Sequence, residues 1–148
     1  MTKRRFHFKL DPVRTLRENH EQAVLKELAA ELDQAATLRR ELGDAADRLE
    51  SARVPGEPTA TGAELAVRQA YVERVERQLR EAQHRVAVQD DHVESTRTRL
   101  AHAVRERQTL DRLEERRRAA HDLELRRAER NEADEVSLVS HLGAGRPA

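Results

Sequence analysis

The sequence predicts an all-α protein: a long antiparallel two-helix coiled coil, or α-helical hairpin, whose second helix projects past the first. Apolar residues recur at steps of three and four residues in two long segments, which is the periodicity of coiled-coil helices. Proline and glycine gather at one point between these segments. Charged residues make up 38% of the chain and aromatic residues 2%, so a core several layers thick is not expected.

The helix boundaries follow from capping and breaking residues. Proline removes a backbone donor and glycine frees the chain, so the stretch VPGEPTATG at 54–62 predicts a bend. Asp11 before Pro12 is a helix-start signal, and Thr61 with Glu64 has the spacing of a capping box. We therefore predict one elongated unit, 1–148. It comprises a helix at 12–53, a loop at 54–61, a helix at 62–136 and a flexible tail at 143–148.

Each predicted helix carries one narrow stripe. The first consists of Leu25, Leu28, Leu32, Ala35, Leu38, Leu42, Ala45, Leu49 and Ala52. The second consists of Val72, Val75, Leu79, Ala82, Val86, Gln89, Val93, Thr96, Leu100 and Ala103. Polar residues at such positions often set the register of a coiled coil, which is the interpretation we favour for Gln89 and Thr96 over a binding role.

The two predicted helices differ in length. If the chain folds about residue 59, Ala103 lies opposite about residue 15, near the start of the first helix. The second stripe also loses its apolar character after that point. The sequence therefore predicts that residues 107–136 form a helical overhang that is unpaired in the isolated protein.

Composition and motif searches argue against several classes of function. Residues 110–136 hold seven arginines but nine acidic residues and no aromatic residue, so nucleic-acid binding is not expected. Cysteine is absent, and the histidines of the second helix lack the i,i+3 or i,i+4 spacing of metal ligands. No membrane span or signal peptide is apparent. We expect a cytoplasmic protein without enzymatic activity, metal or cofactor.

The order of several short motifs resembles the FliJ family of flagellar export proteins. Phe6, Phe8 and Leu10 form an F-x-F-x-L motif before VRTLRENHEQAV. A tyrosine follows early in the second helix, within AYVERVERQLREAQHRV. VESTRTRLAHAVRERQTLDRLEERR and the acidic pair Asp134 and Glu135 complete the pattern. The resemblance covers most of the chain.

This resemblance implies a non-enzymatic component of the flagellar type III export apparatus, peripherally associated with the inner membrane. Such a protein docks on the ring of the export ATPase FliI like the central stalk of a rotary ATPase and links it to the export gate protein FlhA. Some members also handle export chaperones. The overhang and the start of the first helix would face the ring.

Two sets of contact residues follow from this resemblance. The implied ring contacts are Arg112, Arg116, Arg117, Arg118, Arg126 and Arg127. The implied gate contacts are Tyr71 and, as aliphatic replacements for the aromatic residues of better-known members, Leu42, Leu49 and Val75. Two alternatives stay open: a stalk protein of a virulence type III secretion system, and a structural coiled coil that associates with itself.

Overall fold

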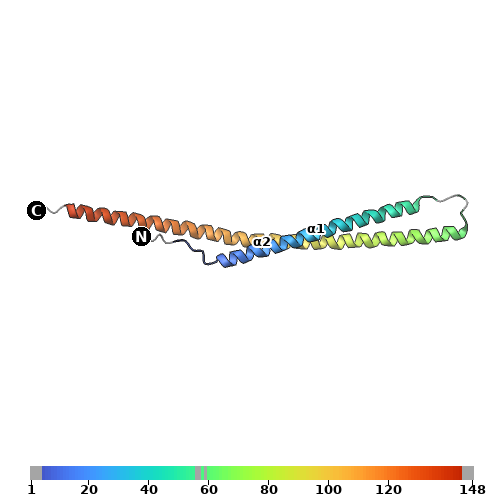
Figure 1. The fold of residues 1–148 in the computed structure, drawn as a ribbon, viewed down its shortest axis with the longest axis horizontal. Helices are drawn as coiled ribbons and strands as arrows, with labels where there is room; N and C mark the ends of the chain where they lie inside the picture. Colours follow the sequence, from blue (N-terminus) through green and yellow to red (C-terminus); the bar gives the residue numbers. More distant parts are fainter. Residues whose placement is uncertain (1–4, 56–57, 59, 145–148) are drawn as a thin grey trace. The chain divides into compact units, whose positions relative to one another are not determined.

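The computed structural model describes residues 5–55, 58 and 60–144. Two helices, α1 (Asp11–Arg53) and α2 (Gly62–Ala144), account for most of them, and no strand occurs in these ranges (Figure 1). The all-α helical-hairpin prediction is therefore confirmed. Helix α2 ends at Ala144 rather than near residue 136. It thus includes the first two residues of the predicted tail, and residues 145–148 lie outside the described part.

The chain divides into two units, where the sequence predicts one. The first unit contains His20–Ala103, with most of α1 and the first half of α2. We call it the hairpin unit. The second contains Met1–Asn19 and Val104–Ala148, and we call it the terminal unit.

The hairpin unit is held by a single seam between α1 and α2, which run side by side (Figure 1). Its buried apolar residues are Val24, Ala35, Leu38, Ala45, Leu49, Val75, Ala82, Val93 and Ala103. Ion pairs flank the seam, and their partners run in opposite directions along the two helices: Glu27–Arg99, Arg39–Asp90, Glu41–Arg85 and Arg53–Glu76. Exposed pairs of this kind contribute at most about 1 kcal/mol each, so burial of the seam carries most of the stability.

The first turns of the α1 seam differ from the predicted stripe. Val24 is 2% exposed, whereas Leu25 and Leu32 are 38% and 39% exposed and lie beside the seam. The inward positions alternate as 24, 28, 31 and 35, so Glu31 occupies a place that the sequence analysis gave to Leu32. An unbroken alternation of four and three residues outweighs the greater hydrophobicity of a neighbouring leucine.

Glu31 is the centre of a polar layer in this seam. The Gln89 amide donates a hydrogen bond to the Glu31 backbone carbonyl at 3.1 Å, and the Thr96 hydroxyl donates to the Glu31 carboxylate at 3.0 Å. Thr96 is buried. A shift of one helix along the other would leave these polar groups without partners. The contacts support the structural interpretation of Gln89 and Thr96 as residues that set register.

The ends of the two helices are not level at the bend. Arg53, the last residue of α1, pairs with Glu76 at 2.8 Å, although α2 begins at Gly62. Helix α2 therefore extends about four turns past the end of α1 at this end of the hairpin. The offset explains why Leu65, Val67 and Tyr71, in these first turns of α2, remain exposed.

The start of α2 has the predicted capping box. The Thr61 amide donates to the Glu64 carboxylate at 2.7 Å, and the Glu64 amide donates to the Thr61 hydroxyl oxygen at 3.3 Å. The bonds from Thr61 hold the pKa of Glu64 below its usual value of 4.5. Because the folded-state pKa is lowered, the cap stabilises the helix above about pH 4.5 and loses this contribution as the pH falls through the lowered pKa.

Replacing Thr61 by alanine is expected to lower the free energy of unfolding by about 1 kcal/mol at neutral pH. The loss should shrink in acid, where protonated Glu64 no longer favours the cap in the parent chain either. Thermal unfolding followed by circular dichroism at neutral and acidic pH measures both effects. Thr98→Ala is the matched control, because the Thr98 hydroxyl donates only to the Glu94 carbonyl within the same helix. An equal loss in the control would contradict a specific role for the cap.

Candidate functional site

The N-terminal strap, which we define as residues 5–10, packs against α2 in the terminal unit. Phe8 is 5% exposed, and the Arg117 guanidinium carbon lies 5.9 Å from the centre of its ring. The Phe6 ring lies 5.5 Å from the His121 ring and 5.5 Å from the Arg118 guanidinium carbon. Aromatic burial and cation–π attraction therefore fix the strap on the helix.

Ion pairs join the start of α1 to the same part of α2. Arg14 and Glu114 are 2.8 Å apart, and Glu114 also contacts Arg118 at 3.2 Å. Arg17 and Glu106 are 2.8 Å apart. The inward-facing stripe of α2 therefore becomes polar after Ala103, but α2 stays in contact with the start of α1 there. Charged side chains take the place of apolar ones in this contact.

The prediction that all of residues 107–136 are unpaired is consequently wrong for the first part of this range. It assumed helix ends that are level at the bend and so placed Ala103 opposite about residue 15. Instead, Arg14 pairs with Glu114. The bend offset shifts α2 along α1, and the strap covers about two further turns of α2. Beyond Leu125, every residue from 126 to 141 is exposed, so this part of α2 matches the prediction.

The six arginines predicted to contact an ATPase ring fall into two groups. Arg117 and Arg118 are exposed but also lie against the phenylalanines of the strap. The other four are exposed and do not contact the strap phenylalanines: Arg112, Arg116, Arg126 and Arg127. The Arg116 side chain donates to the Arg112 carbonyl at 3.3 Å.

The four predicted gate contacts also separate. Leu49 and Val75 are buried in the seam, and Leu42 is half-buried there. Tyr71 is 47% exposed and lines a shallow, mostly apolar hollow of about 530 Å³ with Ala63, Glu64, Val67 and Arg68. Sequence analysis overlooked Val67 because it is not on the seam stripe. A hydrophobic residue outside that stripe, one turn from Tyr71, is the signal that could have identified it.

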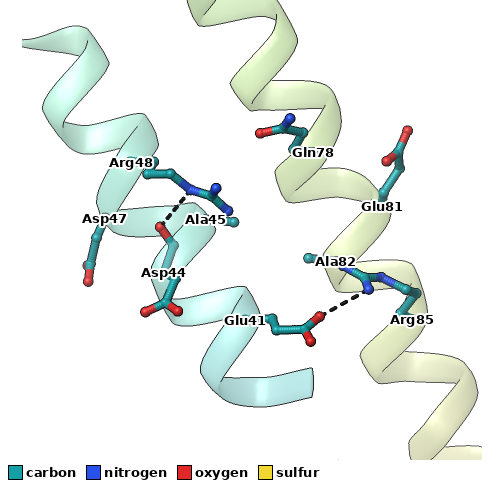
Figure 2. Close-up of a pocket in the computed structure, with 9 residues that line it drawn as sticks. All are labelled: Glu41, Asp44, Ala45, Asp47, Arg48, Gln78, Glu81, Ala82 and Arg85. Atoms are coloured by element: carbon teal, nitrogen blue, oxygen red, sulfur yellow. Dashed lines mark hydrogen bonds and ion pairs between the residues drawn. The ribbon is translucent and has the colours of Figure 1, made fainter. Parts of the chain in front are cut away.

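A second groove, of about 620 Å³, lies between α1 and α2 in the hairpin unit (Figure 2). Ala45 and Ala82 form its floor, and an ion pair of 3.0 Å between Glu41 and Arg85 crosses it. Its rim is polar, with the charged residues Asp44, Asp47, Arg48 and Glu81 and the neutral Gln78. Small seam residues and long charged neighbours explain this hollow as a feature of coiled-coil packing.

The described residues contain neither a cluster suited to a metal ion nor a helix long and apolar enough to cross a membrane. The model of the family described as Flagellar FliJ protein matches residues 6–146. The chain belongs to the FliJ family. No curated protein and no solved structure matches it.

Membership in the FliJ family makes the chain a component of flagellar type III export, as its sequence motifs imply. It also connects the chain with the export apparatus. The match includes the phenylalanines of the strap, the bend and the exposed part of α2. The features described above therefore all belong to the FliJ-like region.

Proposed function

We propose that the chain docks on the ring of the flagellar export ATPase FliI as a stalk-like partner, promotes its assembly or activity, and links it to the export gate protein FlhA. The observation that carries this proposal is the run of exposed helix from 126 to 141 in a member of the FliJ family. A single helix that carries many charges and lacks a partner is suited to enter a ring by many weak contacts. On this proposal the chain is cytoplasmic and peripherally associated with the inner-membrane export apparatus.

The ring-facing residues that we propose are exposed arginines that do not contact the strap phenylalanines. Arg126 and Arg127 lie just past Leu125, after which every residue up to 141 is exposed, and they are followed by the acidic residues Glu132 and Asp134. Alternating charges can meet polar loops of a ring without one tight pocket. Arg117 and Arg118 become ring contacts only where the strap leaves their guanidinium groups accessible.

For the gate we retain Tyr71 and add Val67, since both are exposed beside one hollow at the bend. An exposed tyrosine next to an aliphatic residue is a typical anchor for a protein partner. Leu42, Leu49 and Val75 would act indirectly, by holding the seam beneath this patch. Export chaperones remain candidate partners, and no described contact assigns them a surface.

Adding the chain to the flagellar ATPase is expected to increase ATP hydrolysis, and the double variant Arg126→Glu, Arg127→Glu should lose most of that increase. Charge reversal places glutamates opposite the acidic groups of the ring that the arginines would contact. Like charges brought together in this way typically cost an interface several kcal/mol. The control, Arg74→Glu with Arg77→Glu, changes net charge equally at two exposed positions of the hairpin unit. Stimulation by the ring-face variant that equals stimulation by the control would refute this assignment.

A further inference from the structure

The outer face of α2 in the terminal unit carries a row of arginines, which we call the arginine stripe. It occupies eight positions at alternating steps of four and three residues: Arg105, Thr109, Arg112, Arg116, Ala119, Leu123, Arg126 and Arg130. This spacing keeps the eight side chains on one side of the helix. All eight are exposed, and the row is about 37 Å long at 1.5 Å per residue.

The balanced composition of this segment conceals a segregation of charge. The stripe contains five arginines and no acidic residue. The acids lie elsewhere: Glu114 faces Arg14 of α1, and Glu115, Asp122 and Glu129 follow one edge of the stripe. Residues three or four apart on a helix are neighbours, so these three acids offset part of the charge along that edge. A surface that touches the stripe and this edge meets five arginines and three acids, and the face keeps a net positive charge.

The guanidinium groups of the stripe are available to a partner. Within the described part of the chain, none of its five arginines forms an ion pair with a carboxylate, and Arg116 donates only to the backbone carbonyl of Arg112. Some arginines of the hairpin unit differ, since Arg39, Arg85 and Arg99 each pair with an acid across the seam. Guanidinium groups without an acid partner are suited to bind phosphate.

The middle of the stripe is apolar. Ala119 and Leu123 lie between the pair Arg112 and Arg116 and the pair Arg126 and Arg130, and Leu123 is 50% exposed. Arginine side chains can extend past such a centre, with their apolar stems near it and their charges in a polar layer. Helices that lie in the plane of a membrane surface combine a basic face with apolar residues. The stripe has the basic residues of this pattern but only a small apolar part.

We propose that the arginine stripe docks the chain on the surface of a membrane rich in anionic phospholipid. A straight row of cations can meet a flat array of phosphates along its whole length, whereas a curved duplex would meet only part of it. The exposed Leu123 can insert at the boundary between the lipid headgroups and the acyl chains. The stripe contains no aromatic residue for base stacking, which argues against nucleic acid. The helix lies on the bilayer and does not span it, in agreement with its hydropathy.

Membrane docking does not rest on the proposed ATPase contact, but the two surfaces share residues. Arg112, Arg116 and Arg126 are candidates for both surfaces, so one molecule cannot use them for both at once. Membrane and ATPase ring would then compete for the stripe.

The test is cosedimentation of the full chain with vesicles of phosphatidylcholine containing roughly one-third phosphatidylglycerol, and with vesicles of phosphatidylcholine alone. Each arginine near an anionic surface strengthens binding about fivefold. Arg112→Gln with Arg116→Gln should therefore weaken binding to the anionic vesicles about twenty-fivefold. The control, Arg74→Gln with Arg77→Gln, removes two exposed arginines of the hairpin unit and should bind nearly as the parent chain does. Circular dichroism checks that both variants keep their helices.

Binding that needs phosphatidylglycerol, weakens at high salt and depends on the stripe supports the proposal. Equal binding to both kinds of vesicle overturns it, because the arginines would then play no part. An equal loss in both double variants also overturns it, since net charge alone would explain the binding. Stronger stripe-dependent binding to duplex DNA at the same phosphate concentration would assign the stripe to nucleic acid instead.

Discussion

Replacing Val75 by aspartate is expected to lower the free energy of unfolding by about 3–5 kcal/mol. Val75 is 2% exposed in the seam between α1 and α2. A carboxylate there must be buried without a partner or must push the helices apart. A hairpin with one narrow seam has no second layer that could absorb the change.

Thermal unfolding of Val75→Asp, followed by circular dichroism, measures this effect. Tyr71→Asp is the matched control, one turn away on the same helix but 47% exposed, and it should cost less than about 1 kcal/mol. A gate-binding experiment is therefore informative at Tyr71 and misleading at Val75, where lost binding would report lost structure. An unfolding midpoint for Val75→Asp equal to that of Tyr71→Asp would contradict the buried placement of Val75.

Replacing Phe8 by alanine is expected to detach the N-terminal strap, with a cost of about 3 kcal/mol to the terminal unit. Phe8 is the buried side chain of the strap, and the Arg117 guanidinium lies over its ring. The backbone bonds of the strap lie at its junction with α1, where the Phe8 carbonyl accepts from the Asp11 amide at 3.1 Å and the Leu10 carbonyl accepts from the Arg14 amide at 2.9 Å. The strap should therefore depend on this side chain.

Hydrogen exchange distinguishes local release from general unfolding. In Phe8→Ala, amides near residues 114–121 should exchange faster, while those of the seam around Val93 keep the parent rates. Phe6→Ala is the control of matched chemistry, and its effect should be smaller because Phe6 is only half-buried. Parent-like exchange near 114–121 in the Phe8 variant would show that the strap does not protect α2.

Local sequence signals predicted the helices well because each depends on neighbours in the chain. Thr61 and Glu64 form a cap without help from distant residues, and the seam from Ala35 to Leu49 follows from spacing alone. The break at Pro55 likewise separates two helices. These features are properties of one helix, or of one turn, and a sequence contains them directly.

Relations between segments were harder to predict. The offset at the bend depends on how the Glu31 layer and the ion pairs align two helices, and composition does not reveal it. Phe8 was noted as part of a family motif, yet its burial against α2 follows only from that alignment. Total charge suggested a neutral segment, whereas the position of each arginine around the helix reveals the stripe.

Single-cysteine crosslinking to the export ATPase tests the docking proposal most directly, because the chain has no cysteine of its own. Ala128→Cys and Ala133→Cys place a thiol on the exposed part of α2, and Ala87→Cys places one on an exposed position of the hairpin unit. We predict crosslinks to the ATPase from positions 128 and 133 and little from 87. Crosslinking from position 87 that equals or exceeds that from 128 and 133 would contradict docking through the exposed part of α2.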